Sequence, residues 1–136
     1  MDKTIRDEKS IALTEKIFAL KSVVGFNMLN NSDLFHIAGH AKCKYYQPGS
    51  TIFSQGQVLN MLYIVIQGSI ESTTGESIPP VIGVLSLLFD KPLSETLVIS
   101  REQGAVCLII EKSHFYTLFY QYPALLRKLS EITQLR

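Results

Sequence analysis

Apolar residues recur every three or four positions in the first part of the chain, which predicts two helices. In the first helix, from about Ser10 to Val23, the apolar stripe is Leu13, Ile17, Leu20 and Val24. Residues 27–31 interrupt this pattern. Ser32 and Asp33 then suit the start of a second helix. A serine oxygen accepts a hydrogen bond from an unpaired amide at the N-terminus of a helix, and an acidic side chain in the first turn interacts favourably with the helix dipole. The buried stripe expected for this helix is Leu34, Ile37, Ala38 and Ala41.

From residue 42 to residue 110 the pattern changes to short apolar segments rich in β-branched residues. Gly, Pro, Ser and Asn separate these segments, which favours a sandwich or barrel over a parallel sheet. Pro48 presets φ and Gly49 tolerates a positive φ, so residues 47–50 predict a tight turn of type II. Gly56 and Gly68 end the next two segments in the same way. The expected strands are 42–47, 51–54, 62–66, 69–72, 78–82, 95–99 and 105–110.

Helical spacing returns after Glu111, with Phe115, Leu118 and Phe119 as the apolar stripe. Pro123 suits the first turn of a last helix, whose stripe is Leu126, Leu129 and Ile132. The prediction is a single domain over 1–136, with N-terminal helices in 10–41, a β body in 42–110 and C-terminal helices in 112–136. The last stripe continues to Leu135 without a capping residue. We therefore expect a piece of a longer host protein, and a weak homodimer through this helix.

These segments, in this order, resemble a cyclic-nucleotide-binding domain, the β jelly roll of catabolite activators, kinase regulatory subunits and gated channels. The resemblance rests on the turns at 47–50, 56 and 68, the segment 20–26 that ends in Phe26, the helix start at 31–34, the exit at 110–115 and the pair Tyr122-Pro123. It implies a mainly β fold, a double-stranded β-helix jelly roll with N-terminal and C-terminal helices. It also implies a ligand pocket at the segment that begins with Gly83.

In the family, that segment has a Gly-Glu pair that opens a short helix, followed by an Arg-containing stretch that returns to a strand. The glutamate holds the ribose hydroxyl and the arginine grips the cyclic phosphate. This chain has Val84 and Leu93 at those two positions, while the surrounding pattern is kept. The section from Gly68 to Gly83 is also shorter than in the family, so part of a hairpin is expected to be trimmed. The candidate ligand-binding residues are Gly83, Val84, Ser86, Leu93, Ser94 and Thr96.

The loss of the arginine bears directly on affinity. A guanidinium gives a phosphate two parallel charge-assisted hydrogen bonds, and a buried anion without its partner costs roughly 3–5 kcal/mol. That cost is about two to four decades in the dissociation constant. Lys91 offers a point charge two positions away, and backbone amides after Gly83 recover part of the loss. We expect no tight binding of cyclic AMP or cyclic GMP.

Composition excludes several partners. The chain is 46% hydrophobic and 18% charged, with a net charge of +1 and no basic block, so attraction to nucleic acid or to an anionic membrane is not expected. No apolar run is long enough to span a bilayer, and the charged first ten residues do not resemble a signal peptide, which favours a cytoplasmic location. Cys43 and Cys107 are expected to be buried and reduced, since a disulfide needs an oxidising compartment.

Other chemistry is weakly indicated. His36 and His40 stand four residues apart on the second helix, which suits either a metal pair or an ordinary polar face. No carboxylate or cysteine completes a metal site at that spacing, so neither a metal nor another cofactor is expected. No Ser-His-Asp or Cys-His pattern is visible, and no enzyme activity is expected.

Two functions remain open. One is a sensor, in which a cyclic nucleotide or another small anion enters the roll and moves the C-terminal helix. The other is an interaction module that kept the fold, lost the ligand and docks on the rest of its host; the missing charged pair favours this one. Residues 14–23 resemble the start of degenerate rolls that follow HEAT-type repeats in bacterial membrane nucleotide transporters. That resemblance implies a cytoplasmic domain of a membrane transport protein as the host.

Overall fold

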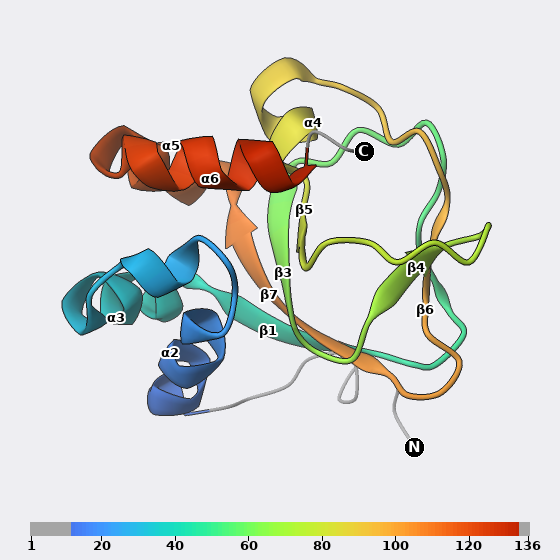
Figure 1. Cartoon of the computed structure of the whole chain (residues 1–136), viewed down its shortest axis with the longest axis horizontal. Helices are drawn as coiled ribbons and strands as arrows, with labels where there is room; N and C mark the ends of the chain where they lie inside the picture. The colour runs from blue at the N-terminus through green and yellow to red at the C-terminus, as the bar shows by residue number, and fades with distance from the viewer. Residues whose placement is uncertain (1–11, 134–136) are drawn as a thin grey trace.

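The structure is a computed structural model that describes residues 12–133 of the chain. Helices gather on one side of the molecule and the strands form a roll on the other (Figure 1). The helices are α2 (Leu13–Lys21), the 3-10 turn η1 (Phe26–Met28), α3 (Asn31–His40), α4 (Val84–Phe89), α5 (Lys112–Gln121) and α6 (Pro123–Thr133). The strands are β1 (Lys42–Tyr46), β2 (Thr51–Phe53), β3 (Met61–Gln67), β4 (Ile70–Ser72), β5 (Val81–Ile82), β6 (Leu97–Ile99) and β7 (Ala105–Glu111).

The strands form two antiparallel sheets. The larger has the order β1-β7-β3-β5 and the smaller has the order β2-β6-β4. The predicted class, mainly β with flanking helices, is confirmed. None of the helices in the described part of the chain has the length and apolar character needed to cross a bilayer.

Strand β7 supplies side chains to both faces of the larger sheet. Val106, Leu108 and Ile110 belong to a cluster on the helix side, together with the buried residues of α2, α3, α5 and α6. Ala105 and Cys107 belong to a second cluster inside the roll, with Phe53, Ile70 and Ile99 among its other members. We name these the helix-side cluster and the roll-side cluster. The alternation follows from the two-residue period of a strand with both faces covered.

The N-terminal helices differ from the prediction at two points. Ser10 lies outside the described residues, and Val24 is 49% exposed whereas Val23 is buried, because α2 ends at Lys21 and the chain turns before Val24. The second helix begins earlier than predicted. Its N-cap is Asn30 and not Ser32, since the Asn30 side chain accepts a 2.8 Å hydrogen bond from the amide of Asp33. The predicted stripe of that helix is buried as expected.

The C-terminal helices follow the prediction with one shift. Phe115, Leu118 and Phe119 are buried, and Pro123 is the first residue of α6. The fully buried pair on α6 is Leu125 and Leu129, whereas Leu126 is half-buried. This face packs at Gly25, where an added Cβ would lie 3.1 Å from Leu129 and 3.4 Å from Leu125. The side chain of Ile132 and all of Leu135 lie outside the described residues.

The strand expected at 78–82 is reduced to β5, which holds two residues. Pro79 and Pro80 have no amide hydrogen and cannot donate to a ladder, so β5 does not extend back to residue 78. The chain turns once after β4 and returns beside it. On that return Ser77 bridges Glu71, and the amide of Ile78 donates to the Ile70 carbonyl at 3.1 Å.

Glycine is required where two backbone segments come close together at the end of β3. Gly68 has a φ of +75°, and an added Cβ would collide with the carbonyl oxygen of Gly104 and lie 2.9 Å from the Cα of Ala105. The predicted type II turn is also confirmed, since Gly49 has a φ of +76° and the Ser50 amide donates to Gln47 at 3.2 Å.

We therefore expect Gly68→Ala to destabilise the fold by at least about 2 kcal/mol, because the new side chain meets both a left-handed backbone and a backbone clash. Gly39→Ala is the matched control. An added Cβ on Gly39 in α3 meets nothing within 4 Å, so this change should stabilise by about 0.5–1 kcal/mol. Urea unfolding followed by circular dichroism measures both. Equal midpoints for the two variants would contradict the packing described for Gly68.

Both cysteines are buried, in agreement with the prediction. Cys43 belongs to the helix-side cluster and Cys107 to the roll-side cluster, so they face opposite sides of the sheet. Burial, with a smaller contribution from Cys43, raises the pKa of Cys107 to about 12.

A thiol whose pKa is raised by folding stabilises the native state below its unfolded pKa and loses that contribution as the pH rises. We expect stability to fall from about pH 9 upward, since the unfolded chain ionises Cys107 and the folded chain does not. Cys107→Ala should remove part of this fall, whatever it costs at neutral pH. Unfolding midpoints measured from pH 7 to about pH 10.5 test this; identical slopes for both proteins would contradict it.

Candidate functional site

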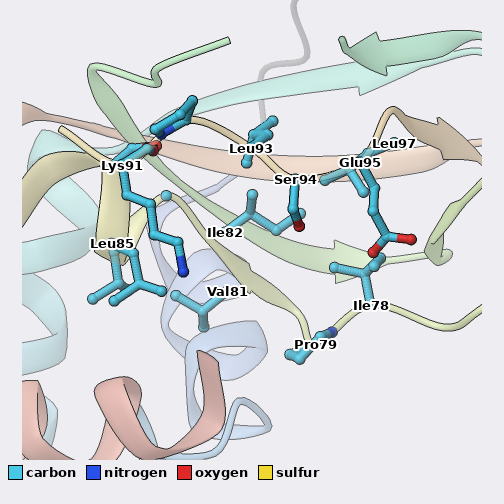
Figure 2. A pocket seen from close by; sticks show the side chains of 14 residues that line it. Ile78, Pro79, Val81, Ile82, Leu85, Lys91, Leu93, Ser94, Glu95 and Leu97 are labelled. Atoms are coloured by element: carbon cyan, nitrogen blue, oxygen red, sulfur yellow. The ribbon is translucent and has the colours of Figure 1, made fainter. Parts of the chain in front are cut away.

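A cavity of about 80 Å³ lies beside α4, where the sequence places its candidate residues. It is bounded by α4, by the segment that returns from α4 to β6, and by Ile78 and Pro79 (Figure 2). Its lining is mostly aliphatic and proline side chains: Ile78, Pro79, Val81, Ile82, Val84, Leu85, Pro92, Leu93 and Leu97. Gly83, Ser86, Lys91, Ser94 and Glu95 complete it.

The turn into α4 depends on Gly83. Its φ is +112°, and an added Cβ would lie 2.7 Å from the carbonyl oxygen of Met61. At the other end of α4, Asp90 adopts a left-handed φ of 54°, and its amide donates to the Ser86 carbonyl at 2.9 Å. The buried hydroxyl of Ser86 donates to the Lys91 carbonyl at 2.7 Å. Backbone and side-chain contacts of the chain itself therefore hold this helix in place.

Leu93 is bound through its backbone to the turn after β2. Its amide donates to the Gln57 carbonyl at 2.9 Å, and its carbonyl accepts from the Gly56 amide at 2.8 Å. The half-buried Leu93 side chain packs against the roll-side cluster. An apolar side chain thus stands where the resemblance implies a phosphate-binding arginine.

The other candidates divide between the cavity and the scaffold. Ser94 lines the cavity, with its hydroxyl on the cavity side in Figure 2. Thr96 does not line it; its hydroxyl oxygen accepts from the Gln55 amide at 3.0 Å and so holds the turn after β2. Val84 is fully buried, and its side chain belongs to the helix-side cluster. Five of the six candidates are therefore brought together at the cavity, and Thr96 supports it from outside.

Among the lining residues only Lys91 and Glu95 are charged, and Figure 2 shows them at different ends of the cavity. Between them the surface is aliphatic, with the Ser94 hydroxyl as a polar point. This arrangement suits an apolar body with a small polar group better than it suits a phosphate, which prefers converging charged donors. The sequence did not reveal that Ile78, Pro79 and Glu95 line the cavity, because their positions depend on the turn between β4 and β5 and on the return to β6.

The cavity is linked to the C-terminal helices through α4. The hydroxyl of Tyr116 on α5 donates a 2.6 Å hydrogen bond to the carbonyl of Leu87 on α4. Helix α6 also contacts α4. A displacement of α4 would thus reach both C-terminal helices.

The three histidines lie away from this cavity, at the contact between α3 and α5. His36 and His40 come from α3, and His114 comes from the first turn of α5. Within residues 12–133, no three His, Cys, Asp or Glu side chains are grouped so that they could hold a metal ion.

Comparison with known proteins agrees with this architecture. No family model matches the sequence. A segment of 87 residues, 60% of this chain, is 30% identical to Rap guanine nucleotide exchange factor 1 of Caenorhabditis elegans, but it spans only 8% of that protein.

Solved structures match more of the chain. The cAMP-bound regulatory domain of Toxoplasma gondii PKA aligns with 94% of this chain and 49% of its own, at a TM-score of 0.71 and 18% identity. A second cyclic-nucleotide-binding domain of a PKA regulatory subunit, bound to Sp-2Cl-cAMPS, aligns over 89% of both chains at 0.70 and 20%. The regulatory subunit of a cAMP-independent protein kinase A from Trypanosoma brucei aligns over 84% of this chain and 44% of its own, at 0.66 and 18%. The fold is therefore the jelly roll of cyclic-nucleotide-binding domains.

Positions 84 and 93, where this chain lacks the charged residues that the resemblance implies, should differ in how a charged side chain affects the stability of the fold. Val84→Glu places a carboxylate in the helix-side cluster without a partner, and we expect a loss of about 3–5 kcal/mol of stability. Leu93→Arg changes a half-buried side chain that lines the cavity and should alter stability by about 1 kcal/mol or less. Urea unfolding of both variants tests this, and a Val84→Glu protein as stable as wild type would show that the side chain reaches solvent.

Proposed function

We propose that this chain is a non-catalytic regulatory domain that keeps the cyclic-nucleotide-binding fold, does not bind cyclic AMP or cyclic GMP tightly, and acts as an interaction module of a larger protein. The observation that carries the proposal is the apolar Leu93 side chain in an aliphatic cavity, at the position where the resemblance implies an arginine. Lys91 supplies one ammonium group to the cavity lining, and this point charge does not replace the paired hydrogen bonds of a guanidinium.

The neighbours support a regulatory role. They include a regulatory domain that binds cAMP and a regulatory subunit of a kinase that is cAMP-independent. The same fold is thus compatible with regulation in the presence and in the absence of cAMP. For this chain, the apolar cavity favours the second case.

A host protein is part of the proposal. The matched exchange factor is an example of a long chain in which a segment like this one is a small part, 8% of the length. A membrane transport protein is the host that the resemblance of residues 14–23 implies. In either case the domain is proposed to lie in the cytoplasm, since two buried cysteines that face opposite sides of a sheet do not bridge each other and suit a reducing compartment.

Self-association through α6 is a weaker proposal. Leu125 and Leu129 are fully buried within the domain, so they do not offer a free surface. A homodimer through this helix would have to use Leu126, which is half-buried, and the last residues of the chain.

No catalytic role is included in the proposal. In the cavity, the Ser86 hydroxyl is engaged by the Lys91 carbonyl. The three histidines stand at the contact of α3 and α5, outside the cavity lining. A serine nucleophile and a histidine base are therefore not brought together there.

A sensor of a different small molecule is the second candidate. The cavity itself favours it, because its volume of about 80 Å³, the Ser94 hydroxyl and two charged residues offer a small ligand space and polar contacts. The contact of Tyr116 with α4 would carry a displacement to α5.

Isothermal titration with cyclic AMP and cyclic GMP tests the proposal. We expect no saturable binding at micromolar concentrations, because the phosphate lacks a guanidinium partner. Leu93→Arg is expected to bring measurable, though weak, affinity, since the surrounding backbone is held by the chain's own hydrogen bonds.

Leu93→Met is the matched control, since it keeps an apolar side chain and should bind neither nucleotide. Micromolar binding by the wild-type domain would overturn the proposal. A folded Leu93→Arg variant that gains nothing would instead assign the loss to the shape of the cavity, with Ile78 and Pro79 as the residues to change next.

A further inference from the structure

The candidate cavity has charged side chains at its two ends and an aliphatic surface between them. Lys91 belongs to the lining at one end and Glu95 at the other (Figure 2). The exposed Lys91 side chain extends toward Leu85 and Val81, so its carbon stem lies along the apolar lining while its ammonium stays accessible to solvent. One end of the cavity therefore offers a cation that a ligand from solution can reach.

The surface between the two charges suits a short hydrocarbon chain. It is formed by branched aliphatic side chains from several parts of the roll: Ile78, Val81, Ile82, Leu93 and Leu97. Each methylene group that a ligand buries on such a surface strengthens binding by roughly fourfold. The volume of about 80 Å³ limits the ligand to a small molecule. An apolar chain of a few carbon atoms is thus the body that this lining favours.

Glu95 determines which end of the cavity can take a negative group. Its carboxylate extends toward Ile78 in Figure 2, so an anion at that end meets a like charge. An anion is favoured only at Lys91, and the part of the ligand that approaches Glu95 must be uncharged. The two ends therefore select a molecule with one anionic end and one apolar end.

The single ammonium indicates the kind of anion. Lysine presents a compact point charge, whereas a phosphate is held best by several converging donors or by a guanidinium. A carboxylate carries one negative charge, which one ammonium balances. We propose that the cavity binds a short aliphatic monocarboxylate, with its carboxylate at Lys91 and its chain on the aliphatic lining. This ligand class belongs to the sensor, the second candidate function, and depends on that use of the cavity.

The test is a titration of the whole chain with sodium hexanoate at pH 7, followed by the NMR amide signals of Leu85, Leu93 and Ser94. We expect saturable shifts at these amides with a dissociation constant on the order of 1 mM, because the ligand has few atoms and Lys91 is exposed. Butyrate has two methylene groups fewer and should bind roughly tenfold more weakly. Sodium chloride at matched concentration is the control for ionic strength.

Variants of Lys91 test the position of the carboxylate. Lys91→Met keeps the length of the side chain and should weaken hexanoate binding by about two- to fivefold, whereas Lys91→Arg should retain it. Ser86 donates to the backbone carbonyl of Lys91, so both variants keep this contact. Lys21→Met is the matched control, because Lys21 ends α2 and does not line the cavity. It should bind hexanoate as the wild type does.

Adipate, which has the same number of carbon atoms and a carboxylate at each end, tests the role of Glu95. The wild type should bind adipate about fivefold more weakly than hexanoate, since the second carboxylate approaches that of Glu95. Glu95→Gln should narrow this difference without weakening the binding of hexanoate. An unchanged difference between the two ligands would contradict the placement of the apolar end beside Glu95.

The proposal is overturned if hexanoate shifts none of the cavity amides up to about 20 mM, or if the shifts lie on another surface. It is also overturned if Lys91→Met binds hexanoate as tightly as the wild type. These outcomes are distinct from micromolar binding of cyclic AMP, the result that overturns the proposed function.

Discussion

The structure depends on one pair of strands that is covered on both faces. β3 and β7 pair antiparallel, with Ile64 opposite Leu108 and Val65 opposite Cys107. Ile64 and Leu108 face the helices, whereas Val65 and Cys107 face the interior of the roll. A slip of one residue would exchange the two sets of side chains, so both clusters specify the same register. Strands β1 and β5 extend this pair at its two edges, and the helix-side and roll-side clusters cover its two faces.

The candidate site shows that the backbone of a pocket and its chemistry can be separated. α4 is held at Gly83 by close contact with β3 and at Ser86 by the Lys91 carbonyl, and the segment that follows it is held at Leu93 by the turn after β2. All these contacts are made by the chain itself. The backbone of the pocket therefore keeps its shape although its side chains are apolar. The side chain at position 93 decides which ligand can bind, whereas the stability of the pocket depends on these other contacts.

Helix α5 brings together parts of the molecule that are far apart in the sequence. Phe115 and Phe119 anchor it in the helix-side cluster, while its exposed side carries contacts to α3 and to α4. Deep burial of the aromatic residues sets the position of the helix. The contacts at His114 and Tyr116 add to this, since they join α5 to α3 and to α4.

Much of the fold was predictable from local pattern. The Pro48-Gly49 turn, the succession of strands along the chain and the apolar stripes of α3 and α5 depend on backbone geometry and periodicity, which a sequence records directly. The apolar identity of residues 84 and 93 was also plain from the sequence. Tertiary structure alone decided where those side chains lie: Val84 in the helix-side cluster, and Leu93 at the cavity.

The remaining differences have the same origin. Leu125 is buried in place of Leu126 because Gly25, a hundred residues earlier, lets α6 approach. The Thr96 hydroxyl serves the turn after β2, and His114 meets His40, through contacts between segments distant in the sequence. Periodicity shows that a helix or strand has an apolar side. Which residue of that side is covered, and which polar groups meet, depends on the packing partner, and the partner is supplied only by the folded chain.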